Sequence, residues 1–274
     1  MAISRFVGAD LAWGDGRDGR SPNESGLALL GLDGQVLDAG WTRGIEETVE
    51  WIDSRVGTES ALLFVDAPLV VTNATGQRPC ETQVGQRYGR WKVSANTTNT
   101  RSPRLAGTNL LRQLEGTGWR YRDGFTGPPT EGRVISECYP YTTLVGAAEL
   151  GYDIERPRYK RKPRTLPTAD WRQIRAAYCD DLIQRLVQLE QADPPLALYS
   201  HPVTQRLVEE PSPLDDEQAY KHREDLVDAL LCAWTAALWA RHGLSRCQVL
   251  GLQGPGTIGP FATIIAPARP EQRR

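Results

Sequence analysis

The pattern of apolar and polar positions divides the chain into strands and helices. Short apolar runs predict strands at residues 6–12, 61–65, 133–139, 247–252 and 261–266. Apolar runs on both sides of Asp33-Gly34 predict a hairpin of 26–32 with 35–41. Apolar residues at helical spacing or in long runs predict helices at 44–56, 141–151, 170–190 and 217–242. Strands that alternate with helices in this way are typical of the α/β class.

Between residues 70 and 132 the composition turns to Arg, Asn, Thr and Gly. Pro79 and Pro103 stand where two short helices would begin, since proline is favoured at an early helical position. The segment contains no apolar run long enough for a core of its own. We therefore predict one domain over 1–268 with an α-helical insertion at about 70–132, followed by a frayed polar tail at 269–274.

Two aspartates lie at the ends of predicted strands. Asp10 lies near the end of the first strand, and Asp66 comes directly after Val65 of another. Strands joined by a crossover helix are usually parallel neighbours, so both acids are expected at the same edge of the sheet, where ligands bind in α/β proteins. A buried aspartate costs several kcal/mol unless it is paired or binds a metal. The alternative for each is a carboxylate that caps a turn.

Three further acids extend this set. Glu137 lies near the end of the third strand. Asp225 and Asp228 are three residues apart on the long helix at 217–242, which places them on one face. The helix is almost purely apolar after Asp228, so this aspartate is not expected on a solvated face. Asp225 could equally be a favourable charge near the start of the helix.

Carboxylates that converge from several elements indicate a site for Mg²⁺ or Mn²⁺, which prefer hard oxygen ligands. Two such ions about 4 Å apart can hold the attacking and leaving oxygens of a phosphoryl transfer. We predict that the metal ligands are Asp10, Asp66, Glu137 and Asp228, and that Asp225 joins them as a catalytic group.

The overall composition is that of a soluble globular protein, with 40% hydrophobic and 24% charged residues. A net charge of -2 gives no overall basic balance for nucleic acid, although a local basic patch could serve. Five cysteines without a C-x-x-C pair predict reduced thiols in a cytoplasmic protein. With neither a signal peptide nor an apolar run of 18 residues, no membrane contact is expected. The oligomeric state stays open, a dimer included.

A resemblance to known proteins rests on stretches spread over nearly the whole chain, at 8–14, 65–69, 75–81, 137–140, 159–160 and 228–232. In them the chain resembles the bacterial and archaeal family called domain of unknown function four-two-nine, described as predicted RNase H-fold nucleases. The D-x-x-D helix resembles that of RuvC-type resolvases. The resemblance implies an RNase H-like fold, with a mixed central sheet and helices on both faces, and a nuclease acting on nucleic acid. RNase H proteins carry an acid on the crossover helix that has no clear match here, and we infer that Glu137 takes its place.

Basic and amide side chains near this edge are candidates for phosphate contacts. The insertion supplies Asn73, Arg78, Lys92 and Arg104, and the densest basic cluster contains Lys160. The alternative for each is a solvated loop residue.

Aromatic residues and glycines leave other interpretations open. Trp91, Trp119 and Tyr121 could stack on bases or belong to the core. An actin-like ATPase or phosphotransferase shares the same core sheet but needs glycine-rich phosphate loops, for which 14–16 and 254–256 are weak candidates. The fold could also carry a non-catalytic binding protein.

Overall fold

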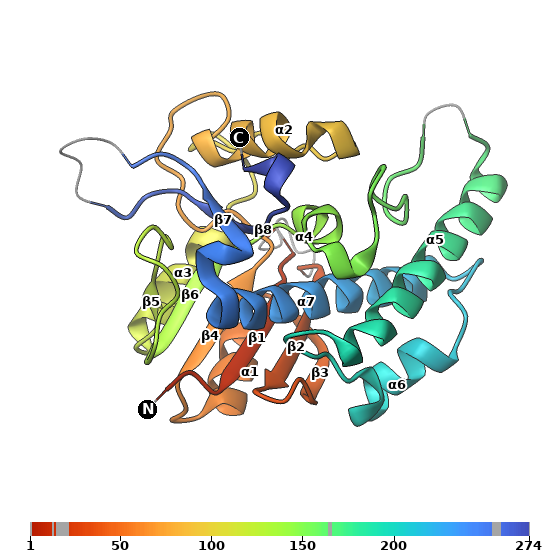
Figure 1. Cartoon of the computed structure of the whole chain (residues 1–274), viewed down its shortest axis with the longest axis horizontal. Coiled ribbons are helices and arrows are strands. Elements are labelled where there is room, and N and C mark those ends of the chain that lie inside the picture. The colour runs from red at the N-terminus through yellow and green to blue at the C-terminus, as the bar shows by residue number, and fades with distance from the viewer. Residues whose placement is uncertain (1, 13, 15–21, 164–165, 254–258, 274) are drawn as a thin grey trace.

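The fold is built on a mixed six-stranded sheet (Figure 1). The computed structural model describes residues 2–12, 14, 22–163, 166–253 and 259–273. In sheet order, the strands are β3 (Val36–Arg43), β2 (Glu24–Gly31), β1 (Arg5–Asp10), β4 (Ala61–Val65), β6 (Arg133–Glu137) and β5 (Arg120–Tyr121). The strands β1, β4, β6 and β5 are parallel to one another, whereas β2 is antiparallel to both of its neighbours.

Helices cover both faces of this sheet. They are α1 (Ile45–Val56), α2 (Pro79–Tyr88), α3 (Ala106–Gly116), α4 (Pro140–Gly146), α5 (Thr168–Gln188), α6 (Pro202–Glu209) and α7 (Glu217–His242). Alternate strand residues point to opposite faces. Val7 and Ala9 of β1 therefore pack with α1 and α3, whereas Phe6 packs on the side of α7. The predicted α/β class with a mixed sheet is confirmed, and the arrangement is consistent with the RNase H-like fold.

The hairpin and the crossover form where the sequence predicts them. Gly34 has φ +78°, a left-handed conformation that glycine adopts without strain, and its N–H donates to the Gly31 carbonyl at 3.1 Å. The crossover helix α1 then leads into β4, which pairs in parallel with β1. The carboxyl ends of β1 and β4 consequently lie side by side.

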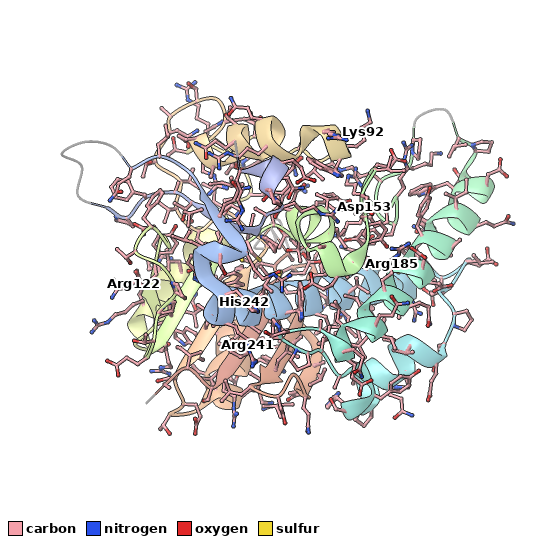
Figure 2. The ribbon with its side chains drawn as sticks, in the orientation of Figure 1. Lys92, Arg122, Asp153, Arg185, Arg241 and His242 are labelled. Carbon is pink, nitrogen blue, oxygen red and sulfur yellow. The ribbon has the colours of Figure 1, made fainter. Side chains whose placement is uncertain are left out.

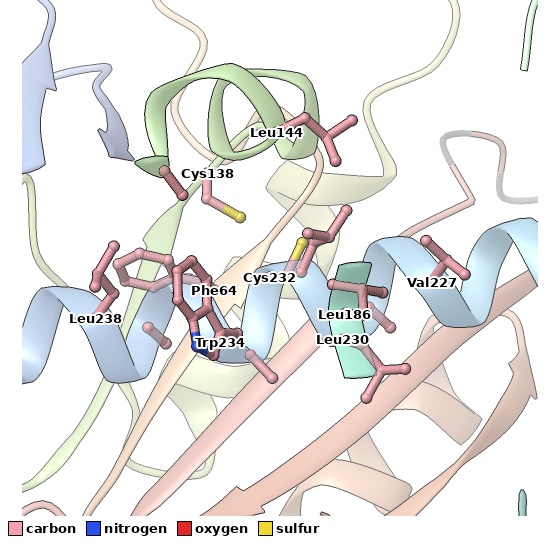
Figure 3. Packing of buried hydrophobic residues seen from close by; sticks show 14 of the residues in the cluster. Phe64, Cys138, Leu144, Leu186, Val227, Leu230, Cys232, Trp234 and Leu238 are labelled. Atoms are coloured by element: carbon pink, nitrogen blue, oxygen red, sulfur yellow. The ribbon is translucent and has the colours of Figure 1, made fainter. Parts of the chain in front are cut away.

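The long helix α7 runs across the middle of one face and contacts β1, β2 and β4 (Figure 1). The apolar second half of α7 is buried against the sheet. Trp234 and Leu238 pack with Phe64 of β4 in the larger core cluster (Figure 3). The same helix carries Asp225 and Asp228 in its first half, so the packing of the second half fixes where these two acids lie.

Some boundaries differ from the predicted ones. The helix predicted at 141–151 ends at Gly146 and continues as a separate 3₁₀ turn, Ala148–Leu150. The last two strands, β7 (Cys247–Leu250) and β8 (Ile264–Pro267), pair with each other in a small antiparallel sheet. The helix expected near Pro103 begins at Ala106.

The segment at 70–132 contributes to both core clusters. Val84 of α2 packs on the α7 side, and Leu110 and Leu114 of α3 pack on the other. The expectation of a frayed tail is wrong for Gln272, which is fully buried. Its side-chain amide donates to the Val145 carbonyl at 3.1 Å, so backbone partners inside the molecule outweigh the polarity of this segment.

All five cysteines are buried and none forms a disulfide. Across the ranges that the structure describes, no helix has both the length and the apolar character that a membrane span requires.

Candidate metal centre

Two strand ends bring Asp10 and Asp66 together. Asp10 is the last residue of β1, and Asp66 follows β4 with its N–H donating to the Ala9 carbonyl at 2.8 Å. This hydrogen bond continues the parallel pairing by one step beyond β4. Alternate residues of a strand point to opposite faces, so Asp10 points to the same face as Phe6, and Asp66 to the same face as Phe64. Phe6 and Phe64 lie in the core cluster on the α7 side. Both carboxylates are therefore on the face that α7 covers.

Close packing of α7 against the sheet adds the acids of this helix. A Cβ atom at Gly8 would lie 2.0 Å from the Ala229 carbonyl oxygen, and one at Gly26 would lie 2.3 Å from the Asp225 carbonyl oxygen. Gly8 is two residues before Asp10, and Gly26 is the register partner of Asp10 on β2. The missing side chains thus let the α7 backbone approach β1 and β2 beside Asp10.

The carboxylates of Asp10, Asp66 and Asp228 form one group, in which one ligand oxygen of each lies within 4.8 Å of those of the other two. Asp228 is fully buried, and the other two are half-buried. Burial and the charge of Asp10 raise the pKa of Asp66 to about 8. Three acids held this close repel one another, and a divalent cation could offset this repulsion.

Asp225 lies beside this group and interacts with Asp10. It is 2% exposed. Burial and then the charge of Asp10 raise its pKa to about 8, and the Lys221 ammonium in contact with it acts in the opposite direction. Asp225 is thus a buried neighbour of the group, and its side chain is more than a solvated charge near a helix start.

The group also has a basic and a phenolic neighbour. Lys160 Nζ forms an ion pair with Asp228 Oδ2, and the Tyr159 hydroxyl donates to Asp228 Oδ1 at 2.6 Å. Tyr159 is fully buried. The loop that carries both residues has neither helix nor strand from 151 to 163. Lys160, predicted to contact substrate, therefore lies at the carboxylates themselves.

The donor set fits a hard divalent cation. Every ligand atom in the group is a carboxylate oxygen, the type that Mg²⁺ and Mn²⁺ prefer. Asp10 Oδ2 is buried and accepts no hydrogen bond from any residue that the structure describes. A buried carboxylate oxygen without a donor is costly, and coordination of a cation would satisfy it.

A family model described as a protein of unknown function (DUF429) matches residues 16–249. The chain belongs to the DUF429 family. The matched span includes Asp66, Lys160, Asp225 and Asp228, and Asp10 precedes it. No curated protein matches the sequence.

Glu137 of this DUF429 protein is not brought into the three-carboxylate group. Its register partner on β4 is Val65, so it has the strand parity of a residue that packs toward α1 and α3. The residue after β6, Cys138, lies at the level of Asp66. Its N–H donates to the Val65 carbonyl at 3.0 Å. Glu137 is one residue out of phase with the two strand-end aspartates.

The Glu137 carboxylate is instead bound by Arg78. Arg78 donates to its two oxygens at 2.8 and 2.6 Å, and the Leu69 N–H donates to it at 3.0 Å. The Arg78 Nε–H also donates to Glu81 at 2.9 Å. Arg78 is 2% exposed, so its predicted contact with substrate does not fit its position. In the DUF429 fold, this network joins the start of α2 to the end of β6.

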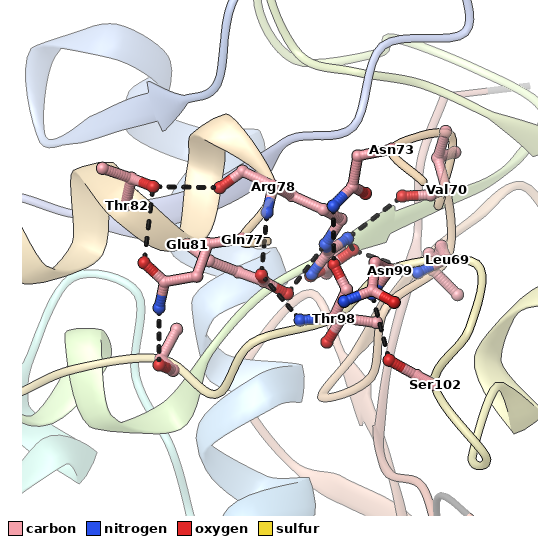
Figure 4. A network of polar contacts seen from close by, with 12 residues as sticks. Leu69, Val70, Asn73, Gln77, Arg78, Glu81, Thr82, Thr98, Asn99 and Ser102 are labelled. Atoms are coloured by element: carbon pink, nitrogen blue, oxygen red, sulfur yellow. Dashed lines mark hydrogen bonds and ion pairs between the residues drawn. The ribbon is translucent and has the colours of Figure 1, made fainter. Parts of the chain in front are cut away.

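The other predicted substrate contacts are distributed over the insertion. The Asn73 side chain donates to the Thr98 carbonyl (Figure 4). It also donates to the carbonyls of Thr75 and Gly76, and these contacts hold the loop together. Lys92 is at the surface beyond the end of α2 (Figure 2), and Arg104 is exposed as well. These two side chains are free of the core, as a phosphate contact requires.

Two other sequence interpretations have different outcomes. Trp91 and Trp119 are buried and belong to the core. Tyr121 is half-buried and donates to the Phe261 carbonyl at 2.7 Å. Most of the glycine-rich stretches at 14–16 and 254–256 lies outside the described residues.

Sequence reasoning missed two residues of the centre in this DUF429 chain. Tyr159 was noted only as part of the 159–160 stretch of the family resemblance, because a tyrosine in a basic loop is not a pattern for a carboxylate partner. Lys221 had a usable signal: it stands four residues before Asp225 on a helix, a spacing at which side chains meet.

Proposed function

We propose that this protein is a Mg²⁺- or Mn²⁺-dependent phosphodiesterase that cleaves nucleic acid. The observation that carries the proposal is the group formed by Asp10, Asp66 and Asp228, which come from β1, β4 and α7. Holding two cations takes several carboxylates from different elements, because one helix or loop cannot surround both. Convergence of acids from three elements at the carboxyl edge of a sheet supports a catalytic metal centre.

The side chains suggest a division of roles. Asp10 is central, because it belongs to the group with Asp66 and Asp228 and also acts on Asp225. Asp225 would extend the ligand set toward a second cation. When bound, the cations would supply a water of lowered pKa and neutralise charge on the phosphate and the leaving oxygen.

Two basic segments meet over this edge and support a polyanionic substrate. The Arg156 guanidinium donates to the Lys92 carbonyl at 2.9 Å, and the Arg161 guanidinium donates to the Asn96 side chain at 2.9 Å. These contacts join the loop around Lys160 to the insertion. Arg and Lys side chains that hold phosphates position a nucleic acid without reading its sequence.

A cleavage screen tests the proposal. The purified chain is incubated with Mn²⁺ and with single-stranded, duplex, branched and RNA–DNA hybrid substrates, beside Asp10→Asn and Asp228→Asn. We expect at least one substrate to be cut and each variant to lose more than about 100-fold in rate, because each removes a ligand charge. Asp170→Asn, an exposed acid on α5, is the matched control and should cut normally.

Two results would contradict the proposal. If Asp10→Asn and Asp228→Asn cut as fast as the parent, the activity comes from another site or a contaminant. If no nucleic acid is cut but ATP is hydrolysed, the phosphotransferase interpretation takes its place.

A further inference from the structure

Lys160 places an ammonium group at the carboxylates that would hold a metal. Its Nζ atom is in ion-pair contact with Asp228 Oδ2, and the carboxylates of Asp10 and Asp66 act on it electrostatically. We infer that the Lys160 ammonium and the divalent cation compete for the same carboxylates, so that Lys160 must withdraw before the cation binds. This inference rests on the proposed function, because it concerns the same metal centre.

The positive charge of Lys160 lets it take the place of a metal ion beside these carboxylates. The Lys160 ammonium lies near the Asp10, Glu224 and Asp66 carboxylates and is paired with Asp228. The side chain is 19% exposed. A lysine in contact with carboxylates is an ammonium ion at neutral pH. An ammonium is a compact cation with three donors and no acceptor, so it offsets the repulsion among carboxylates much as a metal ion does.

The surroundings hold the loop in place, whereas the Lys160 side chain is partly exposed. The neighbouring Tyr159 is fixed twice, because its hydroxyl donates to Asp228 at 2.6 Å and its carbonyl accepts from the Tyr220 hydroxyl at 2.7 Å. Lys160 itself lies 5.7 Å from the ring centre of Tyr141. The long flexible stem of lysine can carry the ammonium away from Asp228 while Tyr159 keeps the backbone where it is.

Lys221 shows the contrast with a lysine at the rim. It contacts Asp225 and Glu224 and is 57% exposed. Its partners lie outside the group of three carboxylates. Lys160, in contrast, is paired with Asp228, a member of that group, which singles it out as the competitor.

Calorimetric titration with Mn²⁺ tests the competition without any measurement of cleavage. Lys160→Met removes the charge and keeps most of the volume, Lys160→Gln provides a second neutral variant, and Lys162→Met is a matched control on the same loop with an exposed side chain. We expect both Lys160 variants to bind Mn²⁺ at least ~10-fold more tightly than the parent, and Lys162→Met to bind like the parent. The metal-free Lys160 variants should also melt at lower temperature, since their carboxylates lose a counter-ion.

The outcomes separate this inference from the proposed function. If the parent binds Mn²⁺ and both Lys160 variants bind equally or more weakly, competition is refuted and the metal centre stands. If neither the parent nor the variants bind Mn²⁺, both proposals fail. Tighter binding by the Lys160 variants supports competition even if no nucleic acid is cut, a result that would count against the nuclease alone.

Discussion

Gly8 in β1 lies against Ala229 in α7 so closely that a Cβ atom on Gly8 would be 2.0 Å from the Ala229 carbonyl oxygen. Ala229 follows Asp228 directly, and Gly8 is two residues before Asp10. The contact between these two backbones therefore sets the separation of Asp10 and Asp228. A glycine that looks unremarkable in a strand thus determines the geometry of the three-carboxylate group.

We expect Gly8→Ala to lower the free energy of unfolding by about 3 kcal/mol, because backbone atoms cannot rotate away from the added methyl group. In whatever fraction folds, α7 would stand farther from β1, and Mn²⁺ affinity should fall as well. Thermal unfolding and Mn²⁺ titration measure the two effects. Gly40→Ala in β3 is the control, since a Cβ there meets no atom within 4 Å. A Gly8→Ala protein with parental stability would show that the helix does not approach the strand this closely.

Asp66→Asn should separate stability from metal binding. Asp66 is held near Asp10, and burial together with that charge disfavours its ionised form. At pH 8, removal of the charge is expected to stabilise the metal-free protein by about 1 kcal/mol and to abolish tight Mn²⁺ binding. Melting curves with and without Mn²⁺ check both effects. If the variant is less stable than the parent and still gains stability from Mn²⁺, Asp66 is not a ligand.

The raised pKa values predict how stability depends on pH. Unfolded aspartates release their protons near pH 4, whereas Asp66 and Asp225 keep theirs in the folded protein until about pH 8. The folded state thus binds more protons between these limits, and the metal-free protein should lose stability as the pH rises from about 4 to 8. Melting temperatures over this range measure the effect. A stability that rises through the same window would contradict the raised pKa values.

Metal binding should show the opposite dependence on pH. A cation needs ionised carboxylates, so Mn²⁺ binding at pH 7 should release protons, and its affinity should increase up to about pH 8. Titrations in buffers of different ionisation enthalpy count the protons released. The Asp225→Asn variant should release fewer. Affinity that does not change between pH 6 and 8 would argue against these two acids as ligands.

Glu137 and Arg78 give a test of the one predicted ligand that lies apart from the group. Glu137→Gln breaks a buried ion pair and leaves the Arg78 charge without its main partner, which costs about 3 to 5 kcal/mol. We expect Mn²⁺ affinity of the folded protein to remain within about threefold of the parent, since the three-carboxylate group is intact. If the variant stays stable but no longer binds Mn²⁺, Glu137 is a metal ligand after all.

The sequence was sufficient for the core fold and for most of the acid cluster, for physical reasons. Asp10 and Asp66 end apolar runs, and the crossover rule makes those runs parallel neighbours. The place of Glu137 could not be judged in the same way. Glu137 pairs with Val65, one residue before Asp66. A shift of one residue along a strand turns the side chain to the opposite face of the sheet.

The position of Lys160 was beyond sequence reasoning as well. A basic, proline-punctuated loop predicts exposed charges, and Arg158, Arg161 and Lys162 of this loop are exposed. The direction of the Lys160 side chain depends on Tyr159, which is buried. The Tyr159 hydroxyl donates a hydrogen bond to Asp228, which is 69 positions away in the sequence. Local patterns contain no information about such long-range pairs.

The central claim is that Asp10, Asp66 and Asp228 bind a divalent cation. Crystals grown or soaked with Mn²⁺ and measured at the manganese absorption edge test it most directly. The account predicts an anomalous peak in contact with all three carboxylates, with the Lys160 side chain turned away from Asp228. Crystals saturated with Mn²⁺ that show no peak between these carboxylates, with Lys160 still paired to Asp228, would contradict it.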